Sequence, residues 1–246
     1  MTNKYMYFVA NWKMYGNLSS LNTLDKVIRF SKSKEIKGGR LIYCPPNTLI
    51  SSFAKKFNNC QIGIGGQNCH ESKDYGAHTG HVNSRMLKNI GAHFVIIGHS
   101  ENREQGESDK LINLKIKSAL EAKLKVIFCI GETLSEKRKK KTRSILSKQI
   151  KIGLKNIKNK SNIFIAYEPV WAIGSGLIPK PQDLFETVEF IKSKFKDKLP
   201  KVLYGGSVNP QNITILRKIN NIDGFLIGGA SQNAKKFIDI VKKTYS

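Results

Sequence analysis

The feature that most constrains the fold is an alternation of short apolar runs with longer segments of helical period. Each run is rich in β-branched or aromatic residues and leads into a polar or glycine-rich turn, which is typical of a buried strand. Eight runs fit this description: Tyr5 to Ala10, Leu41 to Cys44, Gln61 to Ile64, Phe94 to Ile97, Val126 to Ile130, Ile163 to Ala166, Val202 to Tyr204 and Phe225 to Ile227.

Strands that alternate with helices are expected to run parallel, with helices covering their outer faces. Eight such units in 246 residues fit a (β/α)8 barrel, which closes as one domain of roughly 250 residues. A doubly wound open sheet has the same alternation, so the pattern alone leaves the architecture open. No linker or change of composition divides the chain, and we expect a single α/β domain over residues 1–246.

The chain is strongly basic, with 42 lysines and arginines against 18 acidic residues and a formal net charge of +24. Such an excess can mark a nucleic-acid-binding protein, or it can reflect lysines on the exposed helix faces of an ordinary enzyme. The densest run, residues 137–141, contains no aromatic residue, which favours the second interpretation. A positive field would still attract a phosphorylated substrate.

Hydropathy and cysteine usage bear on location. No apolar run approaches the ~18 residues of a membrane span, and we expect a cytoplasmic protein. The four cysteines lie far apart and none forms a CxxC pair, which predicts reduced thiols and gives no support to a metal site. No cofactor is expected.

Polar residues follow the first and fourth predicted strands. Asn11 and Lys13 lie two positions apart, so an extended backbone places them on one face. His99 and Glu101 come where the chain turns from the fourth strand towards a helix, and a histidine there could transfer protons. Taken alone, the first pair could be a strand emerging into solvent, and the histidine could be structural.

The last three predicted strands carry further signals. Glu168 ends the sixth and leads into an apolar, glycine-containing segment, residues 169–176, which needs a surface to close upon. Glycine pairs at 205–206 and 228–229 follow the seventh and eighth strands. Glycines let backbone N–H groups approach an anion, and barrels often bind phosphate after these two strands. Together, the lysine, histidine, glutamate and phosphate loops indicate proton abstraction beside a carbonyl in a small phosphorylated molecule.

These motifs carry a family resemblance. The segments NWKM, GHSE, CIGE, AYEPVWAIG, YGGSV and GGAS occur in the order and approximate spacing of triosephosphate isomerases, and the match extends from about Tyr7 to Ile240. The chain is therefore similar to that family. The resemblance implies a (β/α)8 barrel and an isomerase of glycolysis and gluconeogenesis that interconverts dihydroxyacetone phosphate and glyceraldehyde 3-phosphate. It also implies a homodimer that needs no cofactor.

The resemblance also assigns roles to the reacting groups. It makes Glu168 the base that moves a proton between adjacent carbons and His99 the electrophile at the carbonyl oxygens. It makes Lys13 the cation that stabilises the enediolate, with Asn11 helping to hold that site.

Further positions carry supporting roles by the same resemblance. Glu101 is expected to contact the catalytic lysine, and Cys129 supports the site from the CIGE motif. Subunits of the family pair through a loop that resembles residues 75–81 of this chain. The groups expected to bind the substrate's phosphate are Asn11, Lys13, Gly174, Ser207, Gly228 and Gly229.

One departure from the family concerns the hinge after the expected lid, which contains Pro179. Proline has no N–H, so the hydrogen bond that family members make from that backbone position to the tyrosine of YGGS cannot reach Tyr204 here. We expect this change to affect lid motion and not the catalytic assignment.

Two other functions compete with this one. The barrel could be a different phosphate-binding enzyme, such as a sugar-phosphate isomerase of amino-acid biosynthesis, although the combination of Lys13, His99 and Glu168 argues against it. Alternatively, a basic barrel could bind nucleic acid or another polyanion. A salt-sensitive shift of DNA without isomerase activity would favour that alternative.

Overall fold

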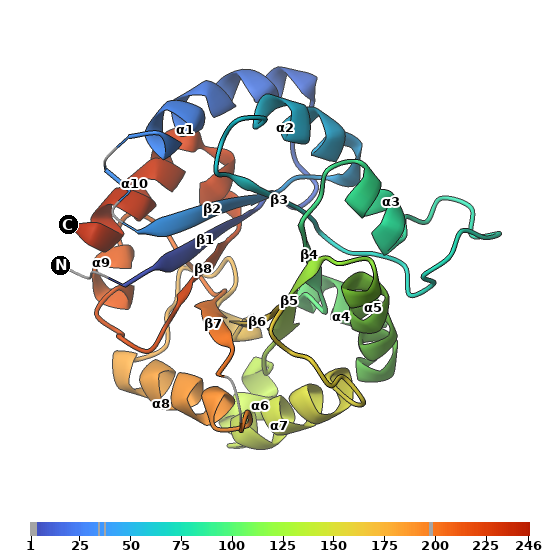
Figure 1. Cartoon of the computed structure of the whole chain (residues 1–246). Coiled ribbons are helices and arrows are strands. Elements are labelled where there is room, and N and C mark those ends of the chain that lie inside the picture. The colour runs from blue at the N-terminus through green and yellow to red at the C-terminus, as the bar shows by residue number, and fades with distance from the viewer. Residues whose placement is uncertain (1–3, 34, 37, 197–198) are drawn as a thin grey trace.

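The chain folds into a closed barrel of parallel strands surrounded by helices (Figure 1). The computed structural model describes residues 4–33, 35–36, 38–196 and 199–246. Each strand pairs with the next in sequence, and the last pairs with the first. Closure excludes the doubly wound open sheet and confirms the (β/α)8 barrel.

The strands lie close to the runs expected from sequence. They are β1 (Met6–Asn11), β2 (Gly39–Cys44), β3 (Gly63–Gly66), β4 (Phe94–Ile97), β5 (Lys125–Ile130), β6 (Ile163–Tyr167), β7 (Lys201–Tyr204) and β8 (Gly224–Ile227).

The predicted bounds of β3, residues 61–64, were wrong. The strand begins and ends two residues later and includes Gly65 and Gly66. A Cβ at Gly65 would lie 2.7 Å from the Cys44 sulfur, and one at Gly66 would lie 2.8 Å from Leu87. The two glycines therefore belong to a tightly packed strand, although their composition suggested a turn.

Helices form the outer ring. The α-helices of the described residues are α1 (Leu24–Ser31), α2 (Ile50–Lys56), α3 (Ser84–Asn89), α4 (Ser100–Glu104), α5 (Asp109–Glu121), α6 (Leu134–Arg138), α7 (Thr142–Gly153), α8 (Pro181–Lys192), α9 (Ile213–Leu216) and α10 (Ala234–Tyr245). Short 3-10 turns are η1 (Leu18–Thr23), η2 (Asn47–Leu49), η3 (Val170–Ala172) and η4 (Gly229–Gln232). No helix in the described ranges is long and apolar enough to cross a membrane.

Two buried clusters follow from the alternation of strand side chains. In β1, Val9 lies in the cluster that fills the barrel, whereas Phe8 and Ala10 pack against the outer helices. Since Asn11 is two residues after Val9, the same alternation points it inwards at the carboxyl end of the barrel. The core therefore sets the direction of the polar groups that follow it.

Candidate active site

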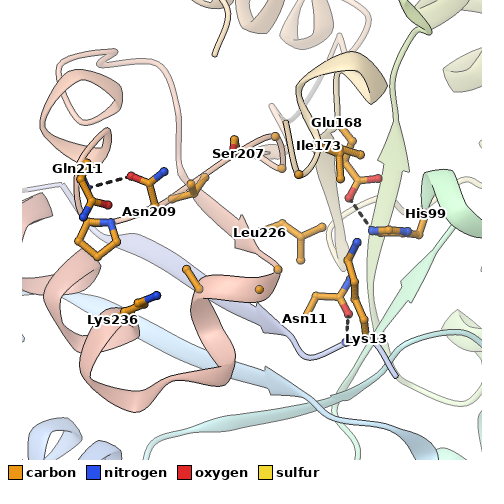
Figure 2. A pocket seen from close by; sticks show the side chains of 18 residues that line it. Asn11, Lys13, His99, Glu168, Ile173, Ser207, Asn209, Gln211, Leu226 and Lys236 are labelled. Carbon is orange, nitrogen blue, oxygen red and sulfur yellow. Dashed lines mark hydrogen bonds and ion pairs between the residues drawn. The ribbon is translucent and has the colours of Figure 1, made fainter. Parts of the chain in front are cut away.

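The polar groups expected from sequence meet at one end of the barrel. Parallel strands place all their carboxyl ends on the same rim, so residues that are distant in sequence become neighbours there. A cavity of about 360 Å³ opens on this rim (Figure 2). Its lining includes every predicted catalytic and phosphate-binding residue: Asn11, Lys13, His99, Glu168, Gly174, Ser207, Gly228 and Gly229.

Glu168 is the buried carboxylate of this cavity, with 2% of its surface exposed. One oxygen lies 3.4 Å from His99 Nε2, and the other accepts a hydrogen bond from the Ser100 backbone N–H at 3.4 Å. Burial raises the pKa of the carboxyl group above its ordinary value, although His99 and the Ser100 N–H oppose that shift. The pKa of the Glu168 carboxyl group is thus shifted towards neutral pH.

Two glycines make room for this glutamate. A Cβ at Gly205 would lie 2.7 Å from Glu168 Cγ, and a Cβ at Gly131 would lie 1.8 Å from the Glu168 carbonyl oxygen. The first glycine of YGGSV is therefore required by close packing against the glutamate as well as by the turn.

His99 is held by the start of α4. Its Nδ1 accepts a hydrogen bond from the Glu101 backbone N–H at 3.3 Å, and its side chain is buried. A neutral imidazole that accepts at Nδ1 carries its proton on Nε2. Nε2 is the atom that faces Glu168 and the cavity, so His99 presents an N–H donor to a bound molecule.

Lys13 has a constrained backbone, with φ of 56°, a region that lysine rarely adopts. Its N–H donates to Asn11 Oδ1, and the Gln67 side chain donates to its carbonyl oxygen at 2.9 Å. Its ammonium forms an ion pair with Glu101 Oε1 at 2.5 Å. The expected contact between Lys13 and Glu101 is therefore present.

The phosphate loops follow β7 and β8. The Ser207 carbonyl oxygen accepts a hydrogen bond from the Asn212 side chain at 2.9 Å, which fixes the first loop. The second loop is closed by the Ser231 hydroxyl, which donates to the Gly228 carbonyl oxygen at 2.7 Å. Backbone N–H groups held in this way are prepared to receive an anion.

The apolar segment at residues 169–176, which the resemblance makes the expected lid, is anchored by Glu132. This buried carboxylate accepts hydrogen bonds from the Trp171 indole at 3.0 Å and from the Tyr167 hydroxyl at 3.1 Å. The Lys137 ammonium lies over the face of the Trp171 ring, 3.4 Å from the ring centroid. The apolar segment thus closes upon a specific surface, as its composition required.

The proline at position 179, where this chain departs from the family, corresponds to an unpaired tyrosine hydroxyl in the described part of the chain. The Tyr204 hydroxyl is buried and has no hydrogen-bond partner among the described residues. This agrees with the expectation that Pro179 leaves the tyrosine of YGGSV without its usual donor.

Cys129 lies inside the barrel and does not line the cavity. Burial first, and then the neighbouring Glu168 carboxylate, raise the pKa of its thiol well above the ordinary value. Cys129 is therefore a neutral thiol beside Glu168. Within the described ranges, no cluster of three or more His, Cys, Asp or Glu residues could hold a metal ion.

The structure gives roles to residues for which the sequence analysis predicted none. Gln67 holds the backbone of Lys13, Glu132 anchors the lid, and Ile173 and Leu226 form apolar walls of the cavity. Strand alternation could have found Leu226, because it points inwards two residues before Gly228. Nothing local marks Gln67, which follows β3 and whose side chain reaches the carbonyl oxygens of Lys13 and Cys44 only once the barrel has formed.

A barrel with its reactive groups and glycine loops on the carboxyl rim belongs to the class of barrel enzymes that act there on small phosphorylated molecules. Residues 6–244 match the family model described as triosephosphate isomerase.

Individual relatives agree with this match over nearly the full length. The triosephosphate isomerase of Thermodesulfovibrio yellowstonii is 41% identical over 245 residues, covering 96% of this chain and 98% of that protein. The enzyme of Bradyrhizobium diazoefficiens is 41% identical over 240 residues, covering 95% of each. The crystal structure of triosephosphate isomerase from Bartonella henselae aligns with a TM-score of 0.88 and 37% identity, covering 98% of this chain and 99% of that one. The chain belongs to the triosephosphate isomerase family, which decides against another sugar-phosphate isomerase.

Proposed function

We propose that Glu168, His99, Lys13 and Asn11 carry out the isomerase reaction in this chain. Membership of the family over the whole chain makes it an intramolecular aldose–ketose isomerase of dihydroxyacetone phosphate and glyceraldehyde 3-phosphate. The observation that supports the residue assignment is the meeting of a buried carboxylate and an imidazole N–H, 3.4 Å apart, in a cavity that also receives an ammonium.

The phosphate of the substrate would bind to the backbone N–H groups near Gly174, Ser207, Gly228 and Gly229. Its two reacting carbons would then lie at the inner end of the cavity, between Glu168 and the donors. Positioning of this kind converts proton abstraction into an intramolecular step.

Glu168 would remove a proton from one carbon, and the C–H electron pair would form the carbon–carbon double bond of an enediolate. His99 Nε2–H and the Lys13 ammonium would stabilise the oxyanion, and Asn11 would fix the Lys13 backbone through its side-chain oxygen. Fixed donors in a site poor in water contribute several kcal/mol to such a step. His99 Nε2–H would give its proton to the enediolate oxygen and take the proton of the neighbouring hydroxyl, and Glu168 would return the carbon-bound proton to the neighbouring carbon, so that carbonyl and hydroxyl exchange places.

The environment of Glu168 supports its role as base. Burial raises its pKa, which strengthens it as a base near neutral pH. Its second oxygen accepts a 3.4 Å hydrogen bond from the Ser100 N–H, a weak bond that a bound substrate can replace.

Glu168→Asp tests the assignment. The variant keeps the charge but withdraws the carboxylate by one methylene, and misplacement on that scale costs ~10²-fold in rate. We expect kcat to fall by about that factor with little change in KM. Glu104→Asp, the same change at an exposed position of α4, is the matched control and should leave both constants unaltered. A Glu168→Asp variant with kcat near that of the wild type would mean that another group is the base.

We further propose that the protein forms a homodimer through the loop at residues 75–81. This segment projects from the ring of helices beside α3 (Figure 1). A second cavity of about 290 Å³, lined in part by Lys13, Glu101 and Asn102, lies next to the active site and could receive the segment of another copy. Exposed apolar side chains near these surfaces include Met14 and Tyr75, at 93% and 64% exposure.

Dimer formation is tested by sedimentation velocity at micromolar protein concentration. We expect a single species of twice the chain mass. A sedimentation coefficient that fits the 27.7 kDa chain at all concentrations would contradict the proposal.

A cytoplasmic location is also part of the proposal. It rests on the family and on the four cysteines, which are all free thiols, three of them buried. Cell fractionation with a periplasmic or organellar marker as the control would test it.

A further inference from the structure

The active-site cavity extends beyond the expected phosphate loops to a second set of polar side chains. Figure 2 shows Asn11, Lys13, His99 and Glu168 gathered at one end, whereas Asn209, Gln211 and Lys236 lie at the other, with Ser207 between them. We refer to Asn209, Gln211 and Lys236 as the outer group. The isomerisation as described uses none of them.

The loop that carries two members of the outer group is rigid. Asn209 Oδ1 accepts hydrogen bonds from the backbone N–H groups of Gln211 and Asn212, both at 2.9 Å. Asn212 in turn accepts from the Asn209 N–H and donates to the Ser207 carbonyl oxygen. Because its oxygen is engaged by two donors, Asn209 has its NH₂ group left for a ligand, and that group is a hydrogen-bond donor.

The third member supplies a charge. Lys236 lies in the first turn of α10, is exposed, and forms no ion pair with any residue that the structure describes. Glu168 is the one acidic residue in the lining, and it lies at the opposite end of the cavity. The outer group therefore presents hydrogen-bond donors and a positive charge that forms no ion pair within the described residues, which are the properties of an anion site.

We propose that the outer group is a second anion subsite, so that the cavity binds molecules with two anionic groups. The first, a phosphate, occupies the loops at Ser207, Gly228 and Gly229, and the second, a phosphate or carboxylate, contacts Lys236 and Asn209. Such molecules compete with the triose phosphate and bind more tightly than analogues with one anionic group. The inference rests on the inner phosphate site proposed above.

The test uses matched pairs of inhibitors. An α,ω-alkane bisphosphonate and the alkylphosphonate of the same chain length differ only in the second anionic group, and a series with about two to five methylenes covers the range of spans. The competitive inhibition constant Ki is measured for each pair at constant ionic strength, because exposed charges are screened by salt. The variants are Lys236→Gln and, as the control, Lys235→Gln, which removes the preceding exposed lysine of α10 that does not line the cavity.

For at least one chain length, the bisphosphonate should have a lower Ki than its monophosphonate. Lys236→Gln should raise that Ki by roughly two- to fivefold, the range for one exposed charge pair, without changing the Ki of the monophosphonate. Lys235→Gln should change neither.

Three results would overturn the proposal. If Lys236→Gln weakens both inhibitors equally, the lysine acts on the inner phosphate or on the general field. If Lys235→Gln has the same effect as Lys236→Gln, the effect belongs to the net charge and not to a site. If the monophosphonates do not compete with substrate, the proposed inner phosphate site is wrong. The outer subsite, which depends on it, is then refuted as well.

Discussion

Replacing Tyr204 by phenylalanine removes a buried hydroxyl that has no hydrogen-bond partner in the part of the chain that the structure describes. The side chain has no exposed surface, and a Cβ built at Gly206 would lie 2.3 Å from the hydroxyl oxygen, so the group packs against the phosphate loop. In the unfolded chain the same hydroxyl bonds to water. Leaving a buried polar group unpaired costs about 1–3 kcal/mol, which the substitution should recover.

A smaller loss opposes this gain. The missing oxygen forfeits a few van der Waals contacts of about 0.1–0.2 kcal/mol each, so the net increase in the free energy of unfolding should be about 1 kcal/mol. For a chain of this size, that corresponds to a rise of about 2–4 °C in Tm. Because Tyr204 makes no hydrogen bond to the lid, kcat should change by less than about threefold.

Tyr167→Phe is the matched control, since it removes a buried hydroxyl that does have a partner. That hydroxyl donates to Glu132, whose oxygens lie 3.1 and 3.2 Å away. Its loss should destabilise the protein by about 1–3 kcal/mol. Both variants are measured by thermal and urea denaturation at one protein concentration, because dimerisation would make Tm depend on concentration.

The reasoning is refuted if Tyr204→Phe lowers the free energy of unfolding as Tyr167→Phe does. A tenfold loss of kcat in Tyr204→Phe would also refute it, because the hydroxyl would then have a partner in the closed state of the lid.

Two further predictions follow from buried titratable groups. Burial raises the pKa of Glu168, so the ionised carboxylate lowers the free energy of unfolding as pH rises above the ordinary value of ~4.3 and through the higher folded value. Measured by urea denaturation, Glu168→Gln should be more stable than wild type at pH 7.5 but not at pH 4. A variant less stable than wild type at pH 7.5 would contradict this. Burial lowers the pKa of His70, whose ring lies 4.3 and 4.7 Å from those of His78 and His81, while Glu71 acts in the opposite direction. The stability that neutral His70 contributes is therefore present above pH ~6.5 and lost as pH falls through the lower folded pKa. Limited proteolysis within residues 70–83 should accelerate towards pH 5.5 in wild type and less so in His70→Asn. Equal acceleration in both proteins would assign the effect to other groups.

Local patterns in the sequence predicted most of the fold. Periodicity identified the strands, and the motifs placed Lys13, His99 and Glu168 at strand ends. The position of β3 was wrong by two residues because Gly65 and Gly66 have the composition of a turn. Their place in the strand depends on Cys44 and Leu87, which approach from other elements.

Alternation of strand and helix determines that the strands are parallel, and parallel strands necessarily bring their carboxyl ends to one rim. The sequence by itself therefore predicted that the motif residues lie at the same end of the strands, whereas alternation alone did not decide between a closed barrel and an open sheet. The sequence could not determine their contacts, because these depend on the register in which the barrel closes. Closure brings the Glu168 carboxylate within 3.4 Å of His99, places Gln67 on the carbonyl oxygen of Lys13, and carries Lys236 from the last helix to the far end of the same cavity. Such distances are set by packing between elements that are remote in the chain, and no local pattern encodes them.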